Sequence, residues 1–259
     1  FKKKTEEWKN KLILKQKNKG PASATQAGIS LATGDYVKLV GGDDVMAPFC
    51  TEILLKTINK KKSVAAFSSY KLLENFNKIK YEECNIKRIK TINNPLLNTV
   101  KSSFSGTTPN LYCNKAIKKS NGCNIKIFVE DFSLVLELAK YGSFSFIENI
   151  TSYGPMNDED RIMTGKRTQL IHDYNAALFY FFKKNYEIDE LIKRVACIKS
   201  LGRADKWYRR IIGKSKFNKM NFYKVLLFLG RKDYVNLIRE SCVFFYKFCG
   251  KDSIRYTIK

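Results

Sequence analysis

The stretch from Asn18 to Pro48 constrains this chain most, because it joins a helix pattern, an apolar run and an acidic turn without interruption. Small and apolar residues at three- and four-residue spacing, with Pro21 near their start, predict a helix over residues 23–33. The face expected to be buried consists of Ala24, Ala27, Gly28, Leu31 and Ala32. Residues 35–40 are then expected to form a buried strand.

The predicted strand ends in the turn Gly41-Gly42-Asp43-Asp44. In an open α/β sheet, ligands bind in the crevice beyond the carboxyl ends of the strands. Two carboxylates there suit a hard cation, Mg²⁺ or Mn²⁺, which takes oxygen ligands and can bridge the protein to a diphosphate. The two glycines would let a bulky anionic ligand approach the backbone closely. An isolated GGDD is also an ordinary turn after a strand, because Gly and Asp are the commonest turn residues.

The whole stretch resembles a run found in family 2 glycosyltransferases, the nucleotide-diphospho-sugar transferases of the GT-A fold. The matching positions are Asn18, Gly20, Ala24, Gly28, Ile29, Ala32, Gly34, Tyr36, Asp43, Asp44 and Pro48. Two places depart from the run. Thr25 and Gln26 replace the usual Arg-Asn pair, and Gly41 stands where the first Asp of the D-x-D motif would be.

This resemblance implies a metal site and a donor site. Asp43 is expected to be the carboxylate that faces a Mg²⁺ or Mn²⁺ ion, with Asp44 beside it. The residues expected to line the cofactor-binding part of the site are Asn18, Gly20, Gly42 and Asp44.

A second acidic pair, Glu130-Asp131, opens a helix predicted to run to Tyr141. Carboxylates in the first turn of a helix favour its macrodipole, which is a sufficient structural explanation by itself. Asp131 follows Asp43 by 88 residues, Glu130 follows Gly122 by eight, and in this place the pair resembles the family's E-D motif. That resemblance implies that Asp131 is the general base for the acceptor hydroxyl, with Glu130 as a second catalytic carboxylate.

The remaining elements are predicted from periodicity and turn residues. Helices are expected over residues 48–60, 114–119, 168–183, 186–200, 204–212 and 221–248, and strands over 12–14, 63–70, 104–112 and, at a sheet edge, 144–150. Residues 71–103 give no clear pattern. The only histidine, His172, lies in a predicted helix, where a lone histidine more often packs than binds a metal or reacts.

These elements predict an α/β protein: a GT-A, Rossmann-like sheet that is incomplete at the N-terminus and is followed by a C-terminal helical extension. Residues 1–155 are predicted to be a partial GT-A catalytic domain, and residues 156–259 a basic helical region. Family members usually carry two βα units before the Asn18 motif, where this chain has 17 residues. The resemblance thus implies an N-terminal truncation, and we expect the chain as given to be inactive.

The formal net charge of +24 is concentrated near the C-terminus, where residues 193–259 hold 18 Lys and Arg against 4 Asp and Glu. Phosphate-bearing partners suit such a surface: anionic lipid, a lipid-diphosphate acceptor or nucleic acid. A solvated helical surface is the alternative. Within residues 221–248, Phe and Leu alternate with Lys and Arg, which is typical of helices lying on an anionic membrane and equally of a helical hairpin packed on the catalytic domain.

Seven cysteines without a CxxC pair argue against a disulfide framework or a zinc site and favour a reducing compartment. No run reaches the ~18 apolar residues of a membrane-spanning helix. We therefore expect a cytoplasmic protein, with the inner face of the cell membrane as a second location.

The sequence predicts an inverting, metal-dependent glycosyltransferase. It would move a sugar from a nucleotide-diphospho-sugar to a saccharide or lipid-linked saccharide in cell-envelope polysaccharide synthesis. The alternative is a catalytically degenerate basic protein that binds nucleic acid or an acidic polymer. No RNP, KH or helix-turn-helix signature is present, so nucleic acid is not the expected partner.

Overall fold

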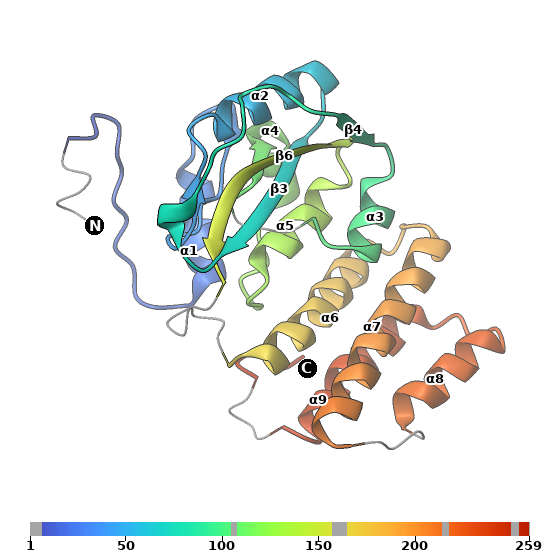
Figure 1. Cartoon of the computed structure of the whole chain (residues 1–259). Coiled ribbons are helices and arrows are strands. Elements are labelled where there is room, and N and C mark those ends of the chain that lie inside the picture. Colours follow the sequence, from blue (N-terminus) through green and yellow to red (C-terminus); the bar gives the residue numbers. More distant parts are fainter. Residues whose placement is uncertain (1–6, 105–107, 157–164, 214–217, 250–253, 259) are drawn as a thin grey trace.

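The computed structural model describes residues 7–104, 108–156, 165–213, 218–249 and 254–258, and every structural statement below concerns these residues. A mixed sheet with helices on both faces forms the upper half of Figure 1, and a layer of helices lies beneath it.

The elements follow one another as α1 (Pro21–Leu31), β1 (Tyr36–Val37), β2 (Val45–Met46), α2 (Cys50–Lys61), β3 (Ala65–Leu73), the 3₁₀ helix η2 (Phe76–Lys78), β4 (Ile89–Ile92), α3 (Pro95–Lys101), β5 (Asn110–Cys113), α4 (Asn114–Ser120), α5 (Glu130–Leu138), β6 (Phe144–Pro155), α6 (Arg167–Lys184), α7 (Glu190–Ile211), α8 (Lys219–Phe228) and α9 (Tyr234–Tyr246).

The sheet has the strand order β1-β5-β3-β6-β2, and β4 also pairs with β6. β3 and β6 run parallel, and the other pairs are antiparallel. The predicted edge strand over 144–150 is therefore wrong in its place: β6 continues to Pro155 and lies inside the sheet. Phe144 and Ile147 are both fully buried, as an interior strand requires.

Alternate side chains of the strands serve two hydrophobic clusters, because successive residues of a strand point to opposite faces. On one face, Ala66 of β3 packs with Ile53 and Leu54 of α2. On the other face, Phe67 packs in a larger cluster that also contains Phe132 of α5. Both predicted helices, over 48–60 and from the acidic pair onward, are confirmed by α2 and α5.

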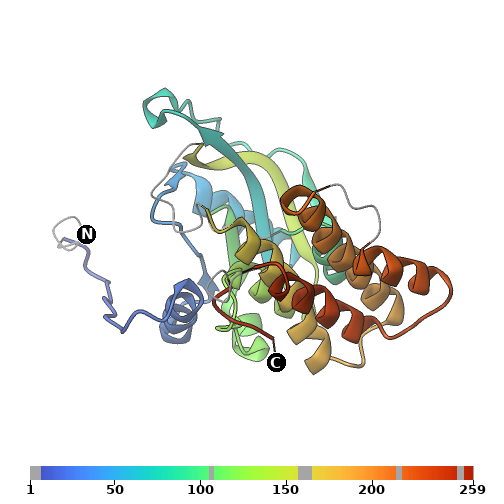
Figure 2. The ribbon, with the colours of Figure 1, turned by 90° about the horizontal axis from the view of Figure 1, so that it is seen from below.

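The segment before α1 is an extended arm that points away from the rest of the molecule (Figures 1 and 2). The predicted strand over 12–14 is wrong, since these residues form no helix or strand and Leu12 is 73% exposed. A strand needs a neighbour that accepts its backbone hydrogen bonds, and this arm lies beside none in the described structure.

The helix predicted over 23–33 is confirmed by α1, but its predicted buried face is wrong. Ala22 and Ile29 are buried, whereas Ala24 and Gly28 are exposed. A polar contact sets this orientation: the Gln26 side-chain oxygen accepts a hydrogen bond of 2.7 Å from the Cys123 backbone N–H.

The strand predicted over 35–40 is confirmed only in its first half, as β1. Beyond it, the Asn110 side chain replaces a strand neighbour by accepting from the Leu39 N–H at 3.0 Å and donating to the Leu39 carbonyl at 3.2 Å. Lys38 donates to the carbonyls of Thr108 and Asn110 at 2.6 and 3.0 Å. Burial lowers the pKa of Lys38. Side chains thus hold this segment against β5.

Residues 71–103, which showed no clear pattern, contain β4 and α3. The start of α3 does carry a local signal: the Asn94 side chain accepts from the Leu97 N–H at 3.1 Å, and Pro95 occupies the first turn. An Asn-Pro pair of this kind is a common helix start.

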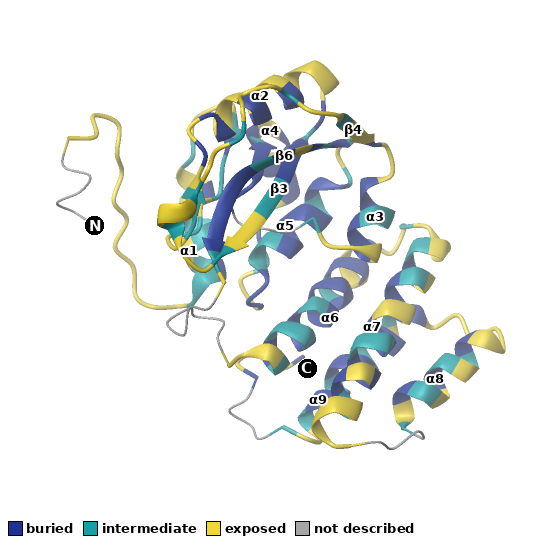
Figure 3. Ribbon diagram, in the orientation of Figure 1, coloured by how far each residue is buried: buried dark blue, intermediate teal, exposed yellow. Residues whose placement is uncertain are grey.

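The C-terminal helices α6, α7 and α9 all pack against one another, α8 packs on α7, and their buried residues form stripes in Figure 3. The two helices predicted over 186–200 and 204–212 are one continuous helix, α7. The single helix predicted over 221–248 is instead two, α8 and α9, because the chain turns at Gly230 with φ +94°. The larger cluster continues from the sheet into α6, α7 and α9, so the proposed domain boundary at 155/156 stays a prediction.

Candidate functional site

Asp44 is anchored at the end of the sheet. Its Oδ1 accepts a hydrogen bond of 2.7 Å from the Tyr70 hydroxyl on β3, and its Oδ2 accepts one from the Thr108 hydroxyl. Thr108 Oγ1 in turn accepts from the Gly41 N–H at 3.1 Å. At Gly154 of β6, a Cβ would lie 1.5 Å from the Tyr70 hydroxyl oxygen, so only glycine fits beside this pair.

The structure gives a reason for Gly41, where the family motif has an aspartate. A Cβ at position 41 would lie 2.8 Å from Oδ2 of Asp44 and 3.1 Å from Oδ1 of Asp43. The turn folds both carboxylates back towards its own first residue, so a side chain there would have to displace them.

Asp43 is exposed, next to the exposed Gly42, whereas Asp44 is partly buried. Among the described residues, no group of three or more His, Cys, Asp or Glu gathers as a metal site. Mg²⁺ is commonly held by one or two protein carboxylates together with substrate phosphates. The Asp43-Asp44 pair therefore fits a cation shared with a diphosphate and does not fit a cage made by the protein alone.

The second acidic pair lies in the first turn of α5, with both side chains partly buried. Glu130 Oε1 lies 3.5 Å from the Thr25 hydroxyl of α1, and Asp131 Oδ1 accepts from the Phe132 N–H at 2.7 Å. Burial raises the pKa of the Glu130 carboxyl to about 7, and the adjacent Asp131 charge acts in the same direction. At neutral pH, Glu130 is thus poised between its two protonation states.

This raised pKa predicts how the stability of the fold varies with pH. A carboxyl whose pKa is raised on folding binds its proton more tightly in the folded chain than in the unfolded chain. The free energy of unfolding therefore falls as the pH rises from about 4.5 to about 7, and it stays at the lower value above pH 7. Glu130→Gln should remove up to ~3 kcal/mol of this dependence and stabilise the protein above pH 7.

Urea unfolding at pH 5 and pH 8 measures the effect, with the exposed Glu187→Gln as the matched control. If Glu130→Gln and the control show the same pH dependence, Glu130 does not carry the raised pKa.

Thr25 and Gln26, which replace the Arg-Asn pair of the family run, contact α5 and the segment before it: Thr25 lies near Glu130, and Gln26 bonds to Cys123. Besides the Gln26 bond to Cys123, Gly122 has φ +71°, and a Cβ there would lie 2.2 Å from Gln26 Oε1. Gly122 can be identified from the sequence but its contact with Gln26 cannot, since nothing in the sequence pairs position 26 with position 122.

The segment that forms β5 connects the two acidic pairs. Thr108 holds Asp44 at its start. At its other end is Tyr112, whose pKa is raised by burial and further by the charge of Asp131. The segment from Thr108 to Tyr112 thus holds Asp44 through a hydrogen bond, and its buried Tyr112 is within reach of the Asp131 charge.

The predicted residues Asn18 and Gly20 lie at the start of α1. Asn18 Oδ1 accepts from the Gly20 N–H at 3.0 Å, and Gly20 has φ +90°. A Cβ on Gly20 would lie 2.8 Å from an Arg255 guanidinium nitrogen. The structure thus brings Arg255, which sequence analysis did not select, to a predicted site residue.

A pocket of about 320 Å³ lies between α4, α5 and α6, with Gly122, Ser133 and Glu137 among its lining residues. None of the predicted catalytic, donor-binding or metal residues lines it, so it is separate from the two acidic pairs.

The sequence model described as Glycosyl transferase family 2 matches residues 1–124. No curated protein matches the chain. Among solved structures, the crystal structure of S. aureus TarS 1–349 is similar, with a TM-score of 0.52, 14% identity, and coverage of 87% of this chain and 63% of that one.

The crystal structure of S. aureus TarS 1–349 in complex with UDP-GlcNAc gives a TM-score of 0.56 at 14% identity, covering 89% of this chain and 66% of that one. The chain therefore spans less than two thirds of the length of these structures, and at such identity the likeness concerns the fold. With the family match, it confirms the predicted assignment: residues 1–124 carry the sequence of a family 2 glycosyltransferase, on an α/β fold of the GT-A type.

Proposed function

We propose that this protein is an inverting, metal-dependent glycosyltransferase that moves a sugar from a nucleotide-diphospho-sugar to an acceptor hydroxyl. The observation that carries the proposal is the anchored acidic turn, in which Tyr70 and Thr108 hold Asp44 on the sheet while Asp43 is exposed. The family match over residues 1–124 supports the same reaction class.

Each acidic residue has a separate role in the proposed reaction. Asp43, exposed at the turn, would hold the cation, and Asp44 keeps that turn on the sheet through Tyr70 and Thr108. A bound Mg²⁺ or Mn²⁺ would neutralise charge on the leaving diphosphate. Asp131 would take the proton of the acceptor hydroxyl as it attacks the anomeric carbon. Glu130, with its raised pKa, would limit the negative charge beside Asp131 at neutral pH.

A uridine diphospho-sugar is the first donor to test, because a similar solved structure is a complex with UDP-GlcNAc. For the acceptor, we propose a saccharide or lipid-linked saccharide of a cell-envelope polysaccharide. The basic C-terminal region supports an acceptor that carries phosphate.

Membrane attachment is proposed for α8 alone. The difference in burial between the two helices supports this: α9 is a core helix, whereas α8 buries only Met220, Tyr223 and Leu227. Its outer face exposes Phe222 by 59% and Phe228 by 85%. No described helix is long and apolar enough to cross a bilayer. A cytoplasmic protein held at the inner face of the cell membrane by this helix is our proposal.

The membrane proposal predicts salt-dependent binding to anionic vesicles, since exposed basic residues such as Arg210 and Lys232 flank the apolar face. The double variant Phe222→Ser and Phe228→Ser should lose most of this binding in a sedimentation assay and keep its melting temperature. Tyr186→Ser, at an 81% exposed position outside α8, is the matched control. Equal vesicle binding by both variants would exclude α8 as the attachment surface.

We also propose that residues 1–259 alone bind nucleotide weakly and lack activity. Among the described strands, β1 pairs only with β5, which leaves its other side without a strand neighbour on which to build a nucleobase site. Calorimetry with UDP and Mn²⁺ checks this, and micromolar affinity in residues 1–259 would contradict it.

The test of the proposed function uses the protein encoded by the complete reading frame. We expect it to consume UDP-GlcNAc and release UDP in Mn²⁺, and to stop when EDTA is added. Binding of RNA or an acidic polymer without any donor turnover would favour the degenerate binding protein instead.

A further inference from the structure

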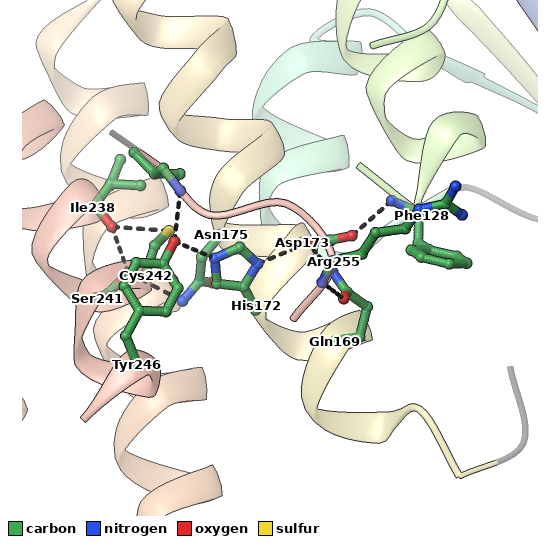
Figure 4. Close-up of polar contacts among 11 residues, drawn as sticks. Phe128, Gln169, His172, Asp173, Asn175, Ile238, Ser241, Cys242, Tyr246 and Arg255 are labelled. Carbon is green, nitrogen blue, oxygen red and sulfur yellow. Dashed lines mark hydrogen bonds and ion pairs between the residues drawn. The ribbon is translucent and has the colours of Figure 1, made fainter. Parts of the chain in front are cut away.

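The last described segment, residues 254–258, lies against α1, α6 and α9 although it has no helix or strand (Figures 2 and 4). Ile254 and Ile258 are buried, at 4% and 5% exposed, and anchor both ends of the segment. The Tyr256 hydroxyl donates to the Lys19 carbonyl at 3.3 Å. These residues, called the C-terminal tail below, therefore have a defined position beside the start of α1.

A buried polar network connects this tail to the segment before the second acidic pair (Figure 4). Asp173 of α6 is fully buried, and its Oδ2 accepts from the Phe128 N–H at 2.6 Å. Its Oδ1 accepts from Gln169 and lies 2.7 Å from Nδ1 of His172. His172 is fully buried as well, with Nε2 at 2.9 Å from the Tyr246 hydroxyl of α9.

Both ends of the tail meet this network. The Ile258 N–H donates to the Tyr246 hydroxyl at 2.6 Å, and the Arg255 N–H donates to Gln169 Oε1 at 2.6 Å. Buried hydrogen bonds of this kind are costly to leave unmade. The position of the tail is therefore coupled to that of Phe128, two residues before Glu130. His172 has a packing role here, in line with the prediction for a lone helical histidine.

The side chain of Arg255 points from the tail towards Phe128. Its guanidinium carbon lies 5.8 Å from the Phe128 ring centroid and 5.4 Å from that of Tyr256. Lys166 Nζ lies 5.2 Å from the same Phe128 ring. Both cations are exposed, and neither forms an ion pair with a described carboxylate. Gly20 makes room for the guanidinium, because any Cβ would lie 2.8 Å from it.

We propose that Arg255, assisted by Lys166, binds a phosphate group of a substrate, so that the C-terminal tail is part of the active site. A guanidinium presents paired N–H donors that match phosphate oxygens, and its cation–π contacts with two aromatic rings favour this position. The role assigned to this phosphate rests on the proposed function. The phosphate belongs either to the donor diphosphate or to the acceptor, and the two sources share the same chemistry at Arg255.

The experiment is an NMR titration of the complete protein with inorganic phosphate and, separately, with UDP in Mn²⁺. Arg255→Gln should weaken phosphate binding about tenfold or more, the scale of one lost charged hydrogen bond. Arg255→Lys should retain part of it. Arg194→Gln, which removes another exposed arginine on α7, should leave it unchanged. Phosphate binding that is equal in Arg255→Gln and the wild type overturns the proposal.

Two further arms complete the test. Phosphate that competes with UDP identifies the donor diphosphate as its source, whereas phosphate that binds together with UDP identifies the acceptor. Tyr246→Phe, which removes the acceptor for the Ile258 N–H, should weaken phosphate binding without changing Arg255 itself; unchanged binding would contradict the role of the tail. Loss of phosphate binding in Arg255→Gln can be observed even if the protein transfers no sugar, so this inference and the proposed function fail separately.

Discussion

In the protein encoded by the complete reading frame, Asp131→Asn lowers sugar transfer by at least ~100-fold, the usual scale of general-base catalysis, and leaves the affinity for the donor nearly unchanged. Asparagine keeps the size of the side chain and its oxygen acceptor, so the bond to the Phe132 N–H can persist. It cannot accept the proton of the acceptor hydroxyl. Initial rates at saturating UDP-sugar measure the effect, and calorimetry gives the donor affinity.

Glu130→Gln is the internal comparison for this prediction, because it changes the neighbouring carboxylate in the same turn of α5. We expect it to retain far more activity than Asp131→Asn and to lose the titration near pH 7 from the rate profile. If Asp131→Asn keeps most of its turnover, another group is the base.

Asp43→Asn weakens Mn²⁺-supported donor binding by about tenfold or more, because a cation that prefers carboxylate oxygen loses a charged ligand. The fold should keep its stability, since Asp43 is an exposed turn residue. UDP binding measured by calorimetry with and without Mn²⁺ gives the metal-dependent part.

Asp44→Asn separates structural from metal roles at the same turn. Asp44 accepts hydrogen bonds from Tyr70 and Thr108, so its replacement should cost about 1–3 kcal/mol of stability, the scale of a disrupted charged hydrogen bond.

Metal-dependent UDP binding that is the same in Asp43→Asn and the wild type would remove Asp43 from the metal site.

Elements with strong local signals could be predicted from the sequence. The turn residues and apolar periodicity of α2, α4 and α5 describe these helices closely, and the resemblance selects the two acidic pairs. What failed depends on distant partners. The buried face of α1 is set by the bond between Gln26 and Cys123, 97 residues apart. The interior place of β6 follows from its pairing with β2, β3 and β4.

The supporting residues of the site could not be predicted for the same reason. Thr108 reaches Asp44 across 64 residues, and Tyr70 reaches it across 26, while both are ordinary residues in their local sequence. Arg255 is one of many basic residues near the C-terminus, and only the packing of the tail distinguishes it. A sequence pattern can select reactive side chains, but the groups that hold them are known only once the chain is folded.

The most direct measurement follows the anomeric configuration of the sugar released from UDP-GlcNAc in Mn²⁺ with water as the acceptor. The reaction uses the protein encoded by the complete reading frame, and proton NMR of the released sugar can record its anomeric configuration before mutarotation. Direct displacement with Asp131 as the base predicts that the released sugar first appears with the anomeric configuration opposite to that of the donor. Release with the donor's configuration, or no release in Mn²⁺ at all, would contradict an inverting transferase.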